Sequence, residues 1–264
     1  MDRNFIVKHW YAFVYEQLEN QTCDVKFLLQ VLSEAQNTNQ VILEVCCGGG
    51  RICIPIAQAG YRVVGFDIDE HMLLRCYGQM KNLSKISCYC ADAVTSDWGM
   101  DYDVVVMAGN IMINIESEMN YAQAQEIFIF RAAKALRSGG HLYLDFDLHY
   151  NPEAVFNNLK ESSYFVGTDD LGTSGRTVSY GSVYNPVTQL CSGSNHVEIT
   201  TNNGEQIIIS EPWLMHVPTQ AQVYCWLKNA GFSIERTYKN YTDEPLSEPI
   251  DESTHRATIW ARKD

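Results

Sequence analysis

From Gln40 onward, short runs of β-forming residues alternate with helical stretches, and this alternation restricts the fold more than any other feature of the chain. The first run, 41–45, leads into Cys46-Cys47-Gly48-Gly49-Gly50, and Gly60 closes the helix that follows. Such repetition is typical of a parallel sheet covered by helices on both faces. Later strands are expected over 61–66, 86–90, 103–108, 141–148, 232–238 and 257–262, and helices over 51–59, 70–80, 121–136 and 220–229.

The character of the chain changes between about Asn151 and Pro218, where Tyr, Thr, Ser, Asn and Gly become frequent. Alternating runs there, with Asn202-Asn203-Gly204 as a turn signal, predict an antiparallel insertion. The first forty residues resemble two helices, and Thr22 or Asp24 is suited to cap the second. Three parts are therefore expected: a helical segment 1–39, an α/β domain 40–150 with 219–264, and a β-rich insertion 151–218 with strands near 177–184, 196–201 and 206–210.

Charge and hydrophobicity exclude several classes of partner. The formal net charge is −13, without a compensating basic run, and affinity for nucleic acids depends largely on Lys and Arg at the phosphates. We therefore expect no nucleic-acid partner. No apolar run is long enough to span a bilayer, and the first residues lack a basic stretch leading into an apolar signal core, so no membrane or secretory role is expected.

The chain contains nine cysteines, but none is spaced for a zinc ribbon or a thioredoxin-like motif. Cys46 and Cys47 are adjacent, Cys88 and Cys90 are separated by one residue, and no C-x-x-C pair occurs. An odd number of cysteines, mostly within apolar segments, is typical of reduced thiols in a cytoplasmic protein. No metal site is expected.

The turn after the first strand departs from the dinucleotide-binding pattern. With Gly48 and Gly50 as the first two glycines of G-x-G-x-x-G, the third position is Cys53. Glu44 precedes the turn, and its carboxylate would repel a pyrophosphate but attract an ammonium group. The turn therefore favours a ligand with a cationic group over NAD.

Two further strand ends carry carboxylates. Asp67 has the position and spacing of a residue that accepts hydrogen bonds from ribose hydroxyls. Asp92 is placed to accept from the exocyclic amine of adenine, and Ile68, Met72 and Ala93 supply apolar walls. A ribose, an adenine and a cationic amino-acid tail together describe S-adenosyl-L-methionine.

These motifs resemble those of class I S-adenosylmethionine-dependent methyltransferases of the small-molecule type. The run Ile42 to Arg51 is similar to the family's first motif, L-E-x-G-C-G-x-G-R, and Val63 to Leu73 is similar to the second. Ala91-Asp92-Ala93 and Tyr102 to Val106 match the third and fourth. Cys46 departs from the pattern, since the family usually has Gly or Ala there, and a slightly tighter turn is expected.

The resemblance implies a doubly wound, Rossmann-like α/β fold with a seven-stranded sheet whose last strand is antiparallel. It also implies S-adenosyl-L-methionine as cofactor and a methyltransferase activity. The helical segment 1–39 would serve as a lid over the cofactor or substrate. The expected cofactor contacts are Glu44, Cys46, Gly48, Gly50, Arg51, Asp67, Ile68, Met72, Asp92, Ala93, Ala108 and Asn110, with Tyr11 and Tyr15 from the first helix.

Methyl transfer from a sulfonium is a one-step displacement, so orientation and desolvation supply most of the rate enhancement. A general base is needed only if the acceptor holds its proton at neutral pH. Candidates for the acceptor side are Asn114, His149 and His216. Each also has a structural interpretation, since His149 can be an exposed loop residue and His216 can cap the following helix. Tyr184 and Trp213 are further aromatic candidates in the insertion.

The acceptor class follows by exclusion. The turn after the fourth strand lacks the two prolines of adenine amino methyltransferases, and no Pro-Cys pair of cytosine C5 enzymes occurs. A small molecule with an N or O nucleophile is therefore expected, in an arrangement similar to N-methyltransferases for amines and amino sugars. The alternatives are a protein or peptide methyltransferase, a non-catalytic S-adenosylmethionine-binding protein, and a nicotinamide oxidoreductase. A monomer or homodimer is expected.

Overall fold

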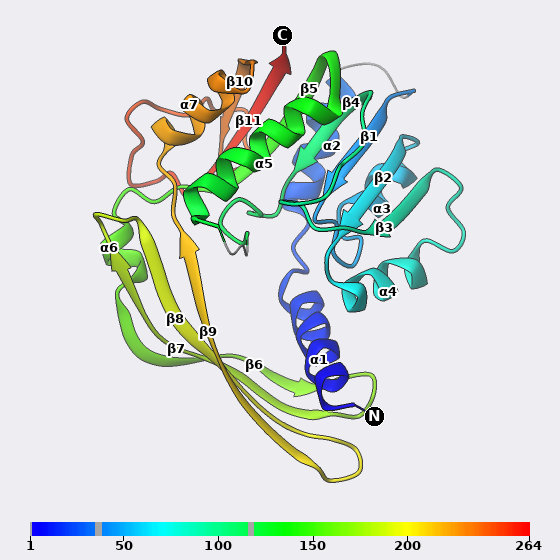
Figure 1. Cartoon of the computed structure of the whole chain (residues 1–264), viewed down its shortest axis with the longest axis vertical. Helices are drawn as coiled ribbons and strands as arrows, with labels where there is room; N and C mark the ends of the chain where they lie inside the picture. Colours follow the sequence, from blue (N-terminus) through cyan, green and yellow to red (C-terminus); the bar gives the residue numbers. More distant parts are fainter. Residues whose placement is uncertain (1, 35–38, 116–118) are drawn as a thin grey trace. The chain divides into compact units, whose positions relative to one another are not determined.

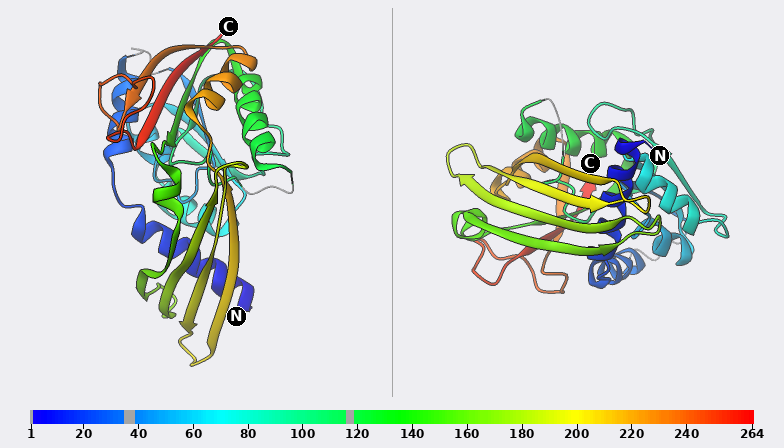
Figure 2. Two further views of the ribbon diagram at one scale, coloured as in Figure 1. Left: turned by 90° about the vertical axis from the view of Figure 1, so that its left-hand side faces the viewer. Right: turned by 90° about the horizontal axis from the view of Figure 1, so that it is seen from below.

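The structure is a computed structural model that describes residues 2–34, 39–115 and 119–264. Its chain divides into two compact units (Figures 1 and 2). One contains residues 1–20 and 151–217, and the other contains residues 21–150 and 218–264. The first two helices thus belong to different units: α1 (Arg3–Leu18) to the former and α2 (Cys23–Glu34) to the latter.

The larger unit contains a seven-stranded sheet in the order β10-β11-β5-β4-β1-β2-β3. Strands β1 to β5 are parallel to one another, whereas β11 runs antiparallel to both β5 and β10. The doubly wound sheet with an antiparallel last strand that the sequence predicts is confirmed. The strands are β1 (Val41–Val45), β2 (Arg62–Asp67), β3 (Ile86–Cys90), β4 (Tyr102–Met107), β5 (Leu136–Asp147), β10 (Phe232–Lys239) and β11 (Arg256–Lys263).

Helices cover both faces of this sheet, because successive side chains of each buried strand point to opposite faces. Leu43 and Val45 of β1 pack with α5 (Tyr121–Ala135) and α7 (Gln220–Asn229). Ile42 packs on the other face with α2, α3 (Cys53–Gln58) and α4 (Glu70–Gln79). None of the described helices is long and apolar enough to cross a membrane.

The smaller unit contains an antiparallel sheet in the order β6-β7-β8-β9 (Figure 2). The expected turn at Asn202-Asn203-Gly204 joins β8 to β9, and Gly204 has a φ of 86°. The strands are longer than predicted, and the first has no counterpart in the prediction, because its polar run Glu161-Ser162-Ser163 hides the β pattern. The elements are α6 (Pro152–Phe156), β6 (Asn158–Thr168), β7 (Ser174–Asn185), β8 (Leu190–Thr200) and β9 (Gln206–His216).

Helix α1 packs on this sheet through a small apolar core. Trp10 is completely buried, contacts the ring of Phe165 edge-on, and donates a hydrogen bond from Nε1 to the Thr177 hydroxyl at 2.8 Å. Its neighbours in this core include Val197 and Ile199 of β8. The helix is therefore an integral part of the smaller unit.

Replacing Trp10 by Ala should destabilise the smaller unit by about 3–5 kcal/mol, because it removes a large buried side chain and leaves a cavity. Tyr15→Ala on the same helix is the matched control, since Tyr15 is 43% exposed, and it should cost less than about 1 kcal/mol. Urea unfolding followed by circular dichroism measures both effects. Equal destabilisation by the two substitutions would show that α1 does not pack as described.

Candidate functional site

The carboxyl ends of β1 to β4 meet at one edge of the larger sheet. β1 lies between β2 and β4, so the strand order reverses beside it. The register pairs Val45 with Phe66 and Asp67 with Cys90, which brings the turns after these strands to the same level. Open α/β sheets bind their ligands in the crevice at such a reversal.

The turn after β1 contains three residues in left-handed backbone conformations. Cys46, Gly48 and Gly50 have φ angles of 57°, 52° and 90°. A Cβ at Gly48 would lie 3.0 Å from the Met72 methyl carbon, and one at Gly50 would lie 2.6 Å from Cδ1 of Ile54. The turn therefore favours glycine at both positions, and Cys46 adopts a left-handed conformation that glycine reaches without strain.

Asp67, at the end of β2, holds this turn in place. One carboxylate oxygen accepts a hydrogen bond from the Gly48 amide at 2.8 Å, and the other accepts from the Asp69 amide at 2.8 Å. Burial raises the pKa of Asp67, while these two hydrogen bonds lower it. Each oxygen retains a lone pair, so the half-buried carboxylate can also accept from ligand hydroxyls.

The next residues position the predicted apolar walls. Asp69 caps α4 by accepting from the amides of His71 and Met72. The Met72 side chain is buried against the turn, whereas Ile68 is 65% exposed.

Asp92 shapes the turn after β3. Its Oδ1 accepts from the amides of Val94 at 2.7 Å and Thr95 at 3.0 Å, and the neighbouring Ala93 is half-buried. The carboxylate itself is half-buried, so it can meet a ligand at the sheet edge.

Glu44 is buried near the carboxyl end of β1, with 3% of its surface exposed. Burial raises the pKa of its carboxyl well above the usual range, with a smaller opposing effect from Cys53. Among the described residues, nothing hydrogen-bonds its Oε2. Burial favours the neutral acid, which weakens the attraction to an ammonium group that the sequence suggests, and a contact with the cofactor stays a prediction.

A second set of polar groups holds the ends of β4 and β5 together. Asn110, with a φ of 63°, donates from Nδ2 to Asp147 at 2.7 Å and accepts from the Asp147 amide at 2.8 Å. Its own amide donates to the buried Asp145 at 3.0 Å. The preceding Ala108 is buried.

Sequence analysis did not identify the centre of this network, Asp145. The Arg256 guanidinium lies 3.2 Å from Asp145 and 2.7 Å from Asp147, and the Tyr241 hydroxyl donates to Asp145 at 3.2 Å. Burial raises the pKa of Asp145, and Arg256 opposes this shift. The available signal in the sequence was a carboxylate, Asp145, between the apolar residues Leu144 and Phe146 of β5.

Arg51 ties the turn after β1 to the start of α2. Its guanidinium forms an ion pair with Asp24 at 2.7 Å and donates to the Gln21 carbonyl at 3.3 Å. A Cβ on Gly109 would lie 3.5 Å from the same guanidinium. The structure thus brings Arg51 to the turn after β4, and its contact with the cofactor stays a prediction.

The candidate catalytic residues have different environments. Asn114 is exposed, and the half-buried His149 follows β5. Burial lowers the pKa of His149, and the positive charges of His255 and Arg256 lower it further. His216, in the smaller unit, is buried, which also lowers its pKa. Both histidines therefore favour the neutral form that a general base requires.

The aromatic candidates also belong to the smaller unit. Tyr11 packs beside the Trp10 core. Burial, and to a smaller extent the nearby Glu211, raises the pKa of Tyr11. Tyr15 is exposed. Tyr184 is buried, and Trp213 packs against its cluster. Their proposed roles toward cofactor and acceptor stay predictions.

Comparison with known proteins identifies a domain model that covers most residues of this site. Residues 42–140 match the family model described as "Methyltransferase domain". An uncharacterized methyltransferase of Synechocystis is 28% identical over 148 residues, which is 53% of this chain. The match spans 66% of that relative's length, slightly less than two thirds.

Solved structures share the fold over nearly the whole chain. A S-adenosylmethionine-dependent methyltransferase from Clostridium acetobutylicum superposes with a TM-score of 0.74 at 15% identity, covering 96% of this chain and 97% of that one. An amino pentose methyltransferase from Micromonospora echinaspora, solved with S-adenosylmethionine bound, gives 0.65 at 14% identity, with 94% of each chain covered. A sugar N-methyltransferase from Streptoalloteichus gives 0.69 at 13% identity, covering 95% and 92%.

These findings agree with the resemblance drawn from the motifs: residues 42–140 match a methyltransferase domain, and the chain shares the fold of S-adenosylmethionine-dependent methyltransferases of known structure.

Proposed function

We propose that this protein transfers the methyl group of S-adenosyl-L-methionine to a small-molecule acceptor with a nitrogen or oxygen nucleophile. The observation that carries the proposal is the sheet edge formed by Gly48, Asp67 and Asp92. There a glycine turn, a half-buried carboxylate and a second strand-end carboxylate follow successive strands. The family match over residues 42–140 supports it.

Each residue of the edge would have a separate task in binding. The turn at Gly48 and Gly50 lets the cofactor approach the backbone, because no side chain intervenes. Asp67 would accept hydrogen bonds from the ribose hydroxyls, and Asp92 from the adenine amine. Met72 would pack against the base, since its side chain is buried beside the turn.

The bound cofactor supplies an already activated methyl group, so the protein has mainly to orient the acceptor and exclude water. An acceptor that holds its proton at neutral pH needs a base. His149 and His216 are the proposed bases, because burial lowers the pKa of both imidazoles. An acceptor amine that is already neutral would need neither.

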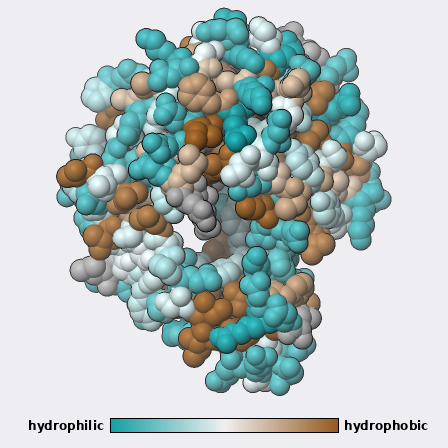
Figure 3. Space-filling view, in the orientation of Figure 1, coloured by the Kyte–Doolittle hydropathy of each residue, from teal (hydrophilic) through white to brown (hydrophobic). Residues whose placement is uncertain are grey.

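The smaller unit supports a small organic acceptor. The solved sugar N-methyltransferase and amino pentose methyltransferase share the fold over 95% and 94% of this chain, so the likeness extends through most of the insertion. Apolar side chains gather among hydrophilic ones over the β6–β9 sheet (Figure 3). Ile208 is 67% exposed and Val166 is 73% exposed. The shared fold supports a small organic acceptor, such as an amino sugar.

The cofactor assignment predicts that S-adenosylmethionine and S-adenosylhomocysteine bind and that NAD does not. Asp67→Ala removes the acceptor of two ribose hydrogen bonds and should cost about 1.5–3 kcal/mol, roughly ten- to hundredfold in affinity. Isothermal titration with S-adenosylhomocysteine measures this loss.

Asp97→Ala is the matched control, since this exposed carboxylate follows the same strand as Asp92 and its removal should leave affinity unchanged. Because Asp67 also holds Gly48, the melting temperature without ligand is measured in parallel. Unchanged affinity in a folded Asp67→Ala protein would refute the site, and tight NAD binding would favour an oxidoreductase.

The acceptor assignment predicts methyl transfer from isotope-labelled S-adenosylmethionine to members of a panel of small amines, amino sugars and phenols, read by mass spectrometry. With a substrate found, His149→Gln, His216→Gln or Trp213→Ala should lower turnover at least about tenfold while cofactor affinity changes only a few-fold, since these side chains would face the acceptor. Transfer only to peptides would favour a protein methyltransferase. Cofactor binding without transfer to any acceptor would favour a non-catalytic binding protein.

A further inference from the structure

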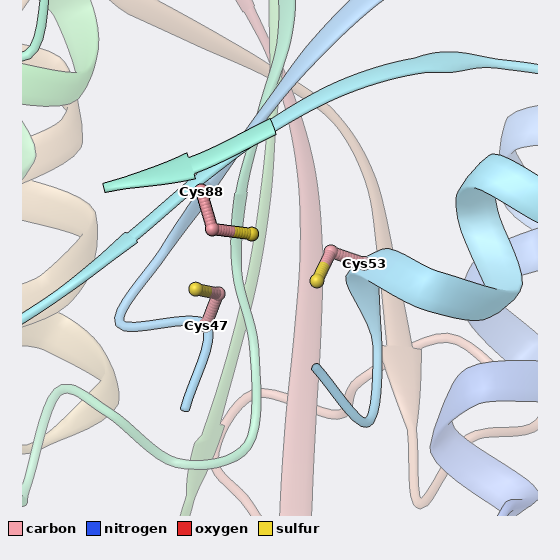
Figure 4. A group of neighbouring side chains, drawn as sticks. All are labelled: Cys47, Cys53 and Cys88. Carbon is pink, nitrogen blue, oxygen red and sulfur yellow. The ribbon is translucent and has the colours of Figure 1, made fainter. Parts of the chain in front are cut away.

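Four thiols converge behind the turn that follows β1. The sulfurs of Cys47, Cys53 and Cys88 all lie within 4.8 Å of one another (Figure 4). The sulfur of Cys76 lies 3.5 Å from that of Cys88. We name these four residues the thiol cluster. Sequence spacing could not reveal it, because its members come from the turn, α3, α4 and β3.

The cluster is enclosed by the larger unit. Cys53 and Cys76 are fully buried, Cys47 is 4% exposed, and Cys88 is half-buried. The remaining cysteines of this unit include Cys23, Cys90 and Cys225, which are exposed. Four thiols at one protected point therefore differ from the scattered thiols that the sequence suggests.

We propose that the thiol cluster binds one thiophilic metal ion, of the Zn²⁺ or Cu⁺ class, through the sulfurs of Cys47, Cys53, Cys76 and Cys88. A tetrahedral ion with metal–sulfur bonds of about 2.3 Å holds its sulfurs about 3.8 Å apart. The sulfurs of Cys76 and Cys88 are 3.5 Å apart and those of Cys47, Cys53 and Cys88 lie within 4.8 Å of one another, so these separations bracket this value. The four thiols would rotate toward a common centre on binding.

The chemistry of the donors selects this class of ion. Four sulfurs without a water-exposed carboxylate suit soft ions and disfavour Mg²⁺ or Ca²⁺, which prefer oxygen. A disulfide fits less well, since its sulfurs must approach to about 2.05 Å and it would use only two of the four. On binding, each coordinated thiol exchanges its S–H bond for an S–metal bond and releases its proton to solvent.

Glu44 supplies a second observation at the same place. Its buried carboxyl lies against the Cys53 thiol, and its Oε2 has no hydrogen-bond partner among the residues that the structure describes. Groups that contact metal ligands in this way orient them and tune the ion. The cluster thus provides four thiols that could coordinate an ion directly and one polar group, Glu44, that contacts a ligand.

The position of the cluster gives the ion a structural role. Cys47 belongs to the turn that contains Gly48, and Cys53 begins the helix after it. An ion there would fasten this turn to β3 and α4 within the larger unit. Binding of the ion can therefore be measured without an acceptor and without methyl transfer.

Cobalt(II) titration of the full, tag-free chain tests the proposal, after reduction and removal of metal by a chelator under anaerobic conditions. We expect one Co²⁺ per chain, with sulfur-to-cobalt charge-transfer absorption and the visible bands of a tetrahedral site. Zn²⁺ should displace the cobalt and raise the melting temperature. A folded wild-type protein that shows no thiolate–cobalt bands overturns the proposal, because the four thiols are then only small core residues.

Variants locate the site. Cys76→Ser and Cys88→Ser should each weaken cobalt binding at least about a hundredfold, because each removes one of four ligands. Cys23→Ser and Cys225→Ser alter exposed thiols of the same unit and should retain wild-type affinity. Retained affinity in the first pair, with folding checked by circular dichroism, or loss of binding in the second pair would contradict the assignment. The wild-type titration decides the matter even if a cluster variant does not fold.

Discussion

The two hydrogen bonds accepted by Asp67 connect the elements on which the candidate site depends. Through the Gly48 amide the carboxylate fixes the turn after β1, and through the Asp69 amide it fixes the start of α4. Both bonds are possible because the parallel register brings the ends of β1 and β2 to the same level. A left-handed turn without side chains at Gly48 and Gly50 would otherwise have many accessible conformations. One half-buried carboxylate therefore shapes the surface that it also offers to a ligand.

A corresponding network orders the other half of the sheet edge. Asp145 is buried within β5, where a lone charge would be costly, and it is compensated by Arg256 and by the amide of Asn110. Asn110 in turn exchanges two hydrogen bonds with Asp147. The left-handed Asn110 can therefore turn the chain sharply after β4. The site thus lies between two polar networks on a rigid sheet.

The sequence predicted the larger sheet well because β1 to β4 are short runs rich in apolar residues that end at or just before a glycine or a carboxylate. The residues of the turn, with Asp67 and Asp92, could be placed at one edge for the same reason. The insertion was harder to predict, since apolar and polar residues do not clearly alternate in β6 and its partner strands were predicted too short. The start of β5 was also missed, because Gly139 and Gly140 suggest a turn although Leu136–Asp147 is one strand.

Local sequence patterns do not predict contacts between residues that are far apart in the chain. The ion pair of Asp145 with Arg256 joins residues far apart in the chain, and nothing local to either residue specifies it. The thiol cluster is the clearest case. Cysteine spacing indicated no metal site. Cys53 and Cys88 nevertheless come together, because α3 packs on the face of the sheet to which Cys88 of β3 points. Asn114 is exposed whereas its apolar neighbours are buried, and its role toward the acceptor stays a prediction.

Hydrogen–deuterium exchange with and without S-adenosylhomocysteine tests most directly whether the cofactor binds at the edge formed by β1, β2 and β3. The account predicts slower exchange on ligand addition in the segments 46–52, 67–72 and 92–95, with little change in β6 to β9. Protection confined to the smaller unit, or no protection at a saturating ligand concentration, would contradict it.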